Sequence, residues 1–159
     1  MVHRLRPVEL DFAESAPVRL VFTGEVRADP QAVYRALAED VEGWPGWFRA
    51  VTSARPTQGG RGREVRLRGG TRFRETIMSR EPGERYAYRI DETNAPGMRA
   101  MLEEWRLAPA GSGTRVRWTM AVDGTAPLRL LTGLAKPAVG RAFRDAVRNL
   151  DRRLTSPAA

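Results

Sequence analysis

Apolar residues between residues 127 and 154 recur at the spacing of an amphipathic helix. When successive residues are placed 100° apart, the apolar ones gather on one arc and the charged ones on the other. The apolar arc contains Val139, Ala142, Phe143, Ala146, Val147, Leu150 and Leu154. Because one such helix is not stable alone in water, the pattern predicts a C-terminal helix packed on a large apolar partner. Gly133 and Pro137 predict a kink or restart near residues 135–137.

The chain between residues 18 and 122 alternates apolar and polar positions and predicts seven strands. The first expected strand runs from Val18 to Val26, and the others lie between glycine- and proline-containing turn signals. Their expected ranges are 50–56, 62–68, 71–80, 84–91, 99–108 and 114–122. Since short hairpins join these strands, we expect an antiparallel sheet, and this sheet is the expected partner of the C-terminal helix.

Two short helical elements are expected between the first two strands. Asp29-Pro30 is typical of a helix N-cap followed by proline at the first helical position. Pro45 then breaks the chain at a corner that also holds Trp44, Trp47 and Phe48. We interpret these aromatic residues as core packing rather than ligand contact, although one residue can have both roles.

The lengths of the hairpin loops assign side chains to the two faces of the sheet, because a shift of one residue reverses every side chain. A two-residue loop at Pro82-Gly83 and a four-residue loop over 110–113 would produce consistent faces across their hairpins, and we predict an odd-length loop or bulge over 69–71. The last of these places Val65 and Leu67 on the inner face. The expected cross-strand pairs are Ile77–Tyr88, Glu75–Ile90, Leu107–Val116, Trp105–Trp118 and Glu103–Met120.

The formal net charge of +8 raises the question of a nucleic-acid partner. Lys136 is the only lysine, so the basicity comes almost wholly from arginine, and many arginines alternate with acidic or apolar residues along the predicted strands. We interpret this as a solvated basic surface. A module that binds nucleic acid or another acidic partner is the disfavoured alternative, and it would require affinity that falls steeply with salt.

The residue types exclude several kinds of site. The chain has no cysteine, and its single histidine, His3, lies in an expected N-terminal arm of residues 1–17, so we expect no disulfide, no metal, no cofactor and no histidine-based triad. No apolar run approaches the ~20 residues that span a bilayer, and the start of the chain lacks the apolar core of a secretion signal. We therefore expect a cytoplasmic protein.

The order of the expected elements resembles the START-related helix-grip superfamily (SRPBCC), in its branch of polyketide cyclase/dehydrase and lipid-transport-like proteins. The resemblance covers about residues 18–154 and rests on scaffold motifs. These are residues 24–34, the corner 44–47, residues 81–85, residues 113–116 and the closing helix. It implies an α+β fold in which a curved seven-stranded antiparallel sheet wraps the last helix around a cavity. Residues 18–156 would form this single domain.

Members of that superfamily bind lipids, polyketides or other hydrophobic molecules, and some catalyse cyclisation or dehydration. The resemblance therefore implies a carrier or sensor of a small hydrophobic molecule, with a cyclase- or dehydratase-type enzyme as the alternative. The inner-face aromatic residues either fill the core or line the cavity. The expected lining is Phe73, Glu75, Ile77, Tyr86, Tyr88, Glu103, Trp105, Trp118, Met120, Phe143 and Val147.

Glu75 and Glu103 are the candidate acidic residues because alternation places both on the apolar face. Burial would raise the pKa of each carboxyl toward the range useful for acid–base chemistry. They should lie too far apart to share a proton, so each should meet a tyrosine hydroxyl, an arginine or water. Together with Tyr88 they are weak catalytic candidates, and a structural ion pair or a carboxylate at a wet rim is the alternative.

One leucine-rich stretch remains open to three interpretations. Leu128, Leu130, Leu131 and Leu134 surround their helical turn on several sides. They would form a gate beside the cavity, a contact between two copies in a homodimer, or extra core.

Overall fold

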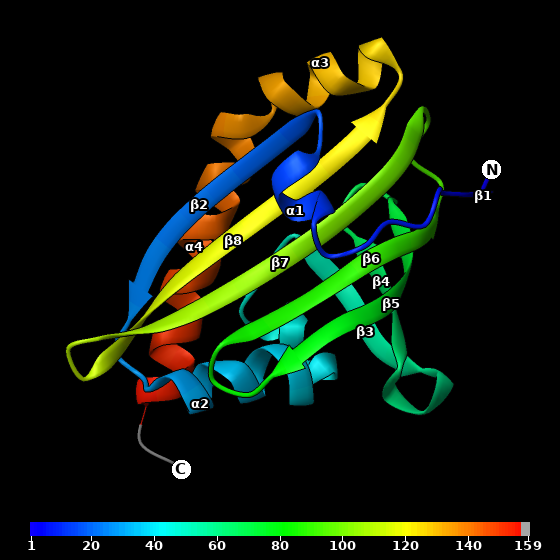
Figure 1. Ribbon diagram of the computed structural model, residues 1–159. Coiled ribbons are helices and arrows are strands. Elements are labelled where there is room, and N and C mark those ends of the chain that lie inside the picture. Colours follow the sequence, from blue (N-terminus) through cyan, green and yellow to red (C-terminus); the bar gives the residue numbers. More distant parts are fainter. Residues whose placement is uncertain (157–159) are drawn as a thin grey trace.

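The computed structural model describes residues 1–156, and its strands form one curved antiparallel sheet (Figure 1). Seven strands follow in the spatial order β2-β8-β7-β6-β5-β4-β3, and the short strand β1 (His3–Arg4) pairs with β6 outside this path. The seven are β2 (Val18–Val26), β3 (Val51–Thr57), β4 (Gly62–Leu67), β5 (Arg72–Glu81), β6 (Arg85–Thr93), β7 (Met98–Ala110) and β8 (Gly113–Gly124). The predicted antiparallel sheet is confirmed.

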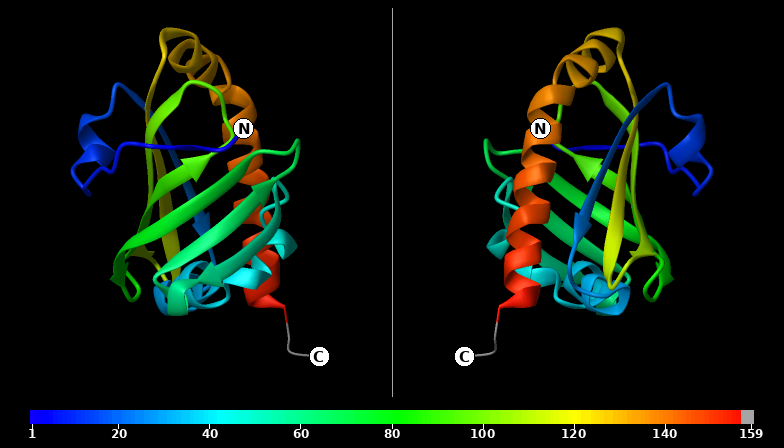
Figure 2. Two further views of the ribbon diagram at one scale, coloured as in Figure 1. Left: turned by 90° about the vertical axis from the view of Figure 1, so that its right-hand side faces the viewer. Right: turned by 90° about the vertical axis from the view of Figure 1, so that its left-hand side faces the viewer.

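The C-terminal segment forms two helices, α3 (Ala126–Leu134) and α4 (Lys136–Thr155), so the predicted restart is confirmed at Ala135. Helix α4 crosses the concave side of the sheet, as the two side views show (Figure 2). Its apolar arc faces the strands, and the ring of Phe143 stacks on that of Trp118 with centroids 5.8 Å apart. This packing supplies the apolar partner that the helical pattern requires, and it confirms the helix-grip arrangement.

The segment between β2 and β3 closes one end of the sheet. It contains α2 (Pro30–Tyr34), a π-helical turn η1 (Arg35–Glu39) and a 3-10 turn η2 (Val41–Gly46). The predicted N-cap is confirmed, since the carboxylate of Asp29 accepts a hydrogen bond of 2.9 Å from the N–H of Ala32. Trp44 and Trp47 are buried with ring centroids 4.7 Å apart, which confirms their place in the core.

The N-terminal residues cover the outer face of the sheet. Besides β1 they form the single helical turn α1 (Phe12–Ser15). Val8, Phe12 and Ala13 pack with outward residues of β7 and β8, and these make a second, smaller apolar cluster. The arm therefore gives the antiparallel sheet an apolar cover on part of its convex side.

The registers of the hairpins agree with the predicted faces. All five predicted cross-strand pairs are present. The loop at Pro82-Gly83 has three residues rather than two, because Glu81 pairs with Arg85. A bulge at Met78 compensates for the extra residue and restores the pairing of Ile77 with Tyr88. The hairpin that joins β7 and β8 is also tighter than expected, since Ala110 pairs with Gly113.

The β4–β5 hairpin has the predicted odd-length loop. Val65 pairs with Phe73, and the N–H of Leu67 donates to the carbonyl of Thr71 at 2.8 Å. Gly69 and Gly70 have φ values of 95° and 99°, a left-handed conformation that glycine adopts at little cost.

The remaining short element is the turn η3 (Gln58–Gly60), which joins β3 to β4.

The leucine-rich helix α3 is mostly solvent-exposed. Leu130, Leu131 and Leu134 are 64%, 63% and 68% exposed, so the interpretation as extra core is wrong for them. Leu128 alone of the four packs against the main core. Among residues 1–156, no helix is both long and apolar enough to cross a membrane.

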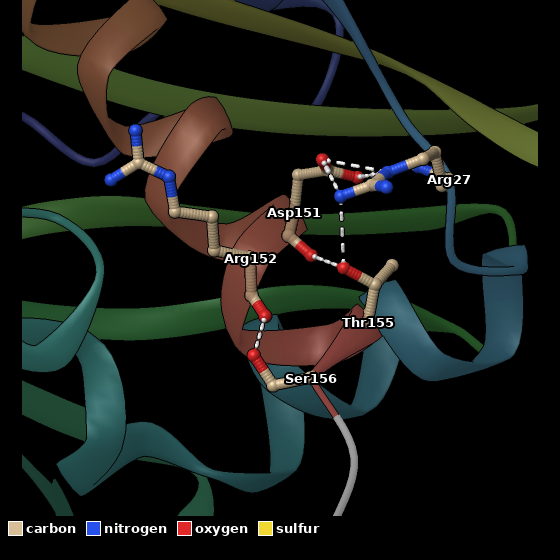
Figure 3. A network of polar contacts seen from close by, with 5 residues as sticks. All are labelled: Arg27, Asp151, Arg152, Thr155 and Ser156. Atoms are coloured by element: carbon tan, nitrogen blue, oxygen red, sulfur yellow. Dashed lines mark hydrogen bonds and ion pairs between the residues drawn. The ribbon is translucent and has the colours of Figure 1, made fainter.

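A polar network joins the end of β2 to the last turns of α4 (Figure 3). The carboxylate of Asp151 accepts a hydrogen bond of 2.7 Å from the backbone N–H of Arg27. It also forms an ion pair with the guanidinium of Arg27 at 2.9 Å. The same guanidinium donates to the hydroxyl of Thr155 at 3.1 Å. These contacts hold the C-terminal end of the helix against the sheet.

Candidate ligand cavity

A cavity of about 170 Å³ lies between the concave face of the sheet and the first half of α4. Its buried walls are mostly aromatic or aliphatic and include Trp44, Phe48, Val65, Phe73, Met101 and Trp118. The half-buried lining residues are Ala50, Leu67, Met120, Val139 and Ala142. Because these residues retain contact with solvent, the cavity approaches the surface between the β4–β5 hairpin and the N-terminal half of α4.

The structure brings part of the expected lining to this cavity. Six of the expected residues line it: Phe73, Glu75, Tyr88, Glu103, Trp118 and Met120. Five do not: Ile77, Tyr86, Trp105, Phe143 and Val147. Ile77 and Tyr86 instead line a separate outer pocket next to Arg63. Trp105 and Phe143 belong to the aromatic cluster of the core, in which the ring of Trp105 stacks on that of Trp118 with centroids 5.3 Å apart.

Trp44 and Phe48 belong both to the core and to the cavity wall. The corner before β3 holds them there, because Pro45 turns the chain and the indole N–H of Trp44 donates to the carbonyl of Leu37 at 2.9 Å. The aromatic corner therefore provides part of the wall as well as seating η2 on the sheet.

Arg63 and Glu75 form a buried ion pair at the floor of the cavity. The Nε–H of Arg63 donates to Oε1 of Glu75, and the guanidinium lies 4.0 Å from the ring centroid of Tyr88 and 4.4 Å from that of Trp44. Nη1 of Arg63 is buried and has no acceptor among residues 1–156. Burial raises the pKa of Glu75 to about 7, against the lowering effect of Arg63 and with a further increase from the charge of Glu103.

Glu103 occupies a different environment, with no cation in hydrogen-bonding contact. The hydroxyl of Tyr88 donates to Oε1 of Glu103 at 2.6 Å, and the indole N–H of Trp118 donates to the same oxygen at 3.1 Å. The indole N–H of Trp105 in turn donates to the Tyr88 oxygen at 3.2 Å. Because an indole N–H can only donate, these directions are fixed, and the Tyr88 proton points to Glu103.

The second carboxyl oxygen of Glu103 is available to a ligand. Oε2 takes part in no hydrogen bond with residues 1–156, and it is not among the fully buried atoms without partners. Burial raises the pKa of the Glu103 carboxyl, while the hydrogen bond from Tyr88 opposes this shift. Two of the predicted kinds of partner are therefore present: Glu75 pairs with an arginine, Arg63, and Glu103 accepts a hydrogen bond from a tyrosine, Tyr88.

Arg63 is the charged cavity residue that the sequence did not predict, and the apolar lining residues Ala50, Val51, Met101, Val139 and Ala142 were not predicted either. Arg63 pairs directly across the β4–β5 hairpin with Glu75. A signal was present, because the alternation 63, 65, 67 puts Arg63 on the same side of its strand as Val65 and Leu67. An arginine at the first of these positions is usually exposed, and residue type alone therefore does not predict that Arg63 is buried.

Residues 17–155 match the family described as polyketide cyclase / dehydrase and lipid transport. The uncharacterized protein Rv2574 of Mycobacterium tuberculosis is 33% identical over 150 residues, which cover 91% of this chain and 89% of that protein.

Two solved structures share the fold. Protein XoxI of Bacillus cereus superposes with a TM-score of 0.70 at 18% identity and covers 86% of this chain and 95% of its own. A START superfamily protein from Mycobacterium smegmatis has a TM-score of 0.69 at 14% identity, with 86% and 96% of the two chains covered. At these identities the similarity concerns the fold alone.

Proposed function

Because the chain belongs to the family of polyketide cyclases/dehydrases and lipid-transport proteins, we propose that it binds a small hydrophobic molecule in the cavity under α4, as a carrier or sensor. One observation carries the proposal: an apolar cavity contains a carboxyl group, that of Glu103, with one oxygen unused by the protein. A hollow of this kind costs packing energy unless a ligand occupies it, since apolar atoms around a void lose contacts.

The cavity volume favours a compact ligand. Drug-sized ligands usually occupy ~300 to 1,000 Å³, whereas this cavity measures about 170 Å³. An engineered apolar cavity of about 150 Å³ binds benzene. We therefore expect a molecule, or the buried part of one, with one or two rings rather than a long acyl chain.

The polar groups favour a ligand with a single oxygen function. A purely apolar molecule would separate Oε2 of Glu103 from water without replacing the lost hydrogen bond, which costs about 1–3 kcal/mol. A hydroxyl or carbonyl oxygen would satisfy Oε2 in its ionised or protonated form, respectively. Tyr88 and Trp118 hold the carboxyl in place for this contact.

The test uses a ring compound with a hydroxyl group and blocks the cavity at its mouth. 2-Naphthol should quench the intrinsic fluorescence of the wild-type protein more strongly, and with higher affinity, than naphthalene. Ala142→Trp introduces a large ring at a half-buried lining position and should weaken 2-naphthol binding at least 10-fold. Ala138→Trp, at an exposed position of the same helix, is the matched control and should leave binding unchanged.

Two results would contradict the binding function. Equal affinity of 2-naphthol for both tryptophan variants would place the probe outside the cavity. Absence of binding to the wild-type protein, together with absence of a copurifying molecule in native mass spectrometry, would remove the experimental basis for a ligand. A copurifying molecule would instead supply the natural ligand for the same comparison.

A second candidate function is acid–base catalysis inside the cavity. It is favoured by the pKa of Glu75, raised to about 7, and by the raised pKa of Glu103 beside the same space. Glu103→Gln keeps an acceptor for Tyr88 and Trp118 but cannot exchange a proton. The test uses a ligand identified by native mass spectrometry. An enzyme is indicated if this variant still binds the ligand but no longer converts it. If the wild-type protein does not convert the ligand either, the carrier function is supported instead.

A further inference from the structure

Helix α3 exposes three leucines on one side, Leu130, Leu131 and Leu134, and we call this set the leucine face. The large hydrophobic residues exposed within residues 1–156 are these three and Met1 and Val2 at the chain start. None of the residues of α3 is buried. A leucine in water is ordinary, but three together on a short helix indicate a binding surface.

The anchoring of α3 determines which side it presents. Leu128 packs against the main core, close to the backbone of Gly124. At 100° per residue, Leu130, Leu134 and Leu131 lie about 200°, 240° and 300° around the helix from Leu128. Leu130 and Leu134 therefore point away from the attachment at Leu128, and Leu131, about 60° from Leu128, continues the same arc along the flank of the helix.

Along the chain, the charged residues between Asp123 and Asp145 all have the same sign. Between residues 124 and 144 the chain contains four charged residues, Arg129, Lys136, Arg141 and Arg144, and no aspartate or glutamate. All four are exposed. This differs from the strands, where many arginines pair with carboxylates, such as Arg74 with Glu92 at 3.3 Å.

From this combination we propose that the leucine face docks on an anionic lipid surface. Leucines that enter the acyl boundary and cations that meet the headgroups are the two components of interfacial helix binding. Near an anionic membrane each lysine or arginine contributes about 1 kcal/mol. Helix α3 has nine residues, so it lies in the interface rather than spanning the bilayer.

The shape of the molecule permits this contact. Helix α3 lies at one end of the domain, beyond the ends of β2 and β8, where a flat surface can reach it (Figures 1 and 2). A second copy of the chain fits less well, because a two-fold contact through the same face would bring both sets of cations together. The charge pattern therefore selects a negatively charged partner.

Docking at α3 would also place the cavity near the lipid surface. Helix α4 follows directly after Ala135, and its residues Val139 and Ala142 line the cavity. Lipid binding by the leucine face is nevertheless independent of whether the cavity holds a ligand. The two proposals can therefore fail separately.

Vesicle cosedimentation tests the docking directly. The wild-type protein should bind vesicles of phosphatidylcholine with 30% phosphatidylglycerol, bind pure phosphatidylcholine at least 10-fold more weakly, and lose affinity as salt increases. Leu130→Ser/Leu134→Ser should weaken binding at least 10-fold, and Arg129→Ser/Lys136→Ser should also weaken it. Arg152→Ser removes an exposed cation near the far end of α4 and should have little effect.

The substituted side chains are exposed, so circular dichroism should show the same fold in every variant. Equal binding of the double leucine variant and the wild-type protein would overturn the proposal. So would failure of the wild-type protein to bind the anionic vesicles at low salt. A concentration-dependent dimer in sedimentation velocity that the leucine substitutions abolish, without any vesicle binding, would assign the face to a second copy instead.

Discussion

Arg63 and Glu75 face each other across the β4–β5 hairpin with side chains that are only 2% and 1% exposed. The pair lies between two hollows, because Arg63 lines both the ligand cavity and a separate outer pocket that also contains Ile77 and Tyr86. The rings of Trp44, Tyr86 and Tyr88 and the carboxylate of Glu75 surround the guanidinium. Such a pair costs desolvation energy, but breaking it costs more, since one charge is then left buried and uncompensated.

Removal of Arg63 alone should therefore be strongly destabilising. In urea denaturation at pH 8, Arg63→Met should lower the free energy of unfolding by about 3–5 kcal/mol. Arg63→Met/Glu75→Leu should recover a large part of this loss because neither charge remains. Arg55→Met removes an exposed partner of Glu64 and should cost below about 1 kcal/mol. Similar losses in the two single variants would contradict the buried-pair interpretation.

Glu75 should make stability depend on pH. Its pKa is about 7 in the folded protein and 4.5 as the ordinary value, so folding favours the protonated form. Its stabilising contribution is complete below pH 4.5 and is lost as the pH rises through about 7, a change of roughly 3 kcal/mol. The free energy of unfolding should fall between pH 5 and 8, and Glu75→Gln should reduce that fall.

Glu64→Gln is the control for this pH dependence. The hydrogen bond from Arg55 lowers the pKa of Glu64, so this group stays ionised between pH 5 and 8. Its substitution should leave the slope unchanged over that interval. An unchanged slope in Glu75→Gln would show that another group titrates.

Two glycine-to-alanine substitutions should have opposite effects on Tm. A Cβ at Gly113 would lie 2.3 Å from the carbonyl oxygen of Val26, so Gly113→Ala must move backbone and should cost about 2 kcal/mol. A Cβ at Gly133 meets nothing within 4 Å inside α3, and Gly133→Ala should stabilise by about 0.5–1 kcal/mol. Thermal unfolding of both variants distinguishes a close backbone approach from an unneeded glycine.

Asp151 should contribute stability that disappears in acid. Its hydrogen bonds with Arg27 lower the pKa of the Asp151 carboxyl below 3.8, so this contribution is present above pH 3.8 and is lost as the pH falls through the folded-state value. Asp151→Asn should lower Tm by roughly 2–4 °C at pH 7 and by less at pH 3. Arg152→Ala is a suitable control, because the Arg152 guanidinium points away from the network in Figure 3. A drop in Tm that is equal at both pH values would exclude the ionic contribution.

The strand and helix pattern was readable from the sequence because it depends on local periodicity. Alternation placed Trp105 opposite Trp118 and Glu103 opposite Met120, and the structure has both pairs. The 3.6-residue period placed Phe143 and Leu150 on the buried side of α4. The face assignment holds even where a loop has a different length than expected, because the bulge at Met78 compensates for the extra residue in the loop after Glu81.

Three features were decided only by the tertiary structure. The size of the cavity depends on how Trp105, Trp118 and Phe143 stack, and no periodicity specifies a stack. The partner of Glu75 depends on the register of the β4–β5 hairpin, since one residue more or less in its loop would place a different residue opposite Glu75. The exposure of Leu130, Leu131 and Leu134 depends on the direction in which α3 leaves the sheet, since leucines at those positions suit a core equally well. Periodicity records which side of an element is apolar, whereas volume, pairing and exposure depend on what that side meets.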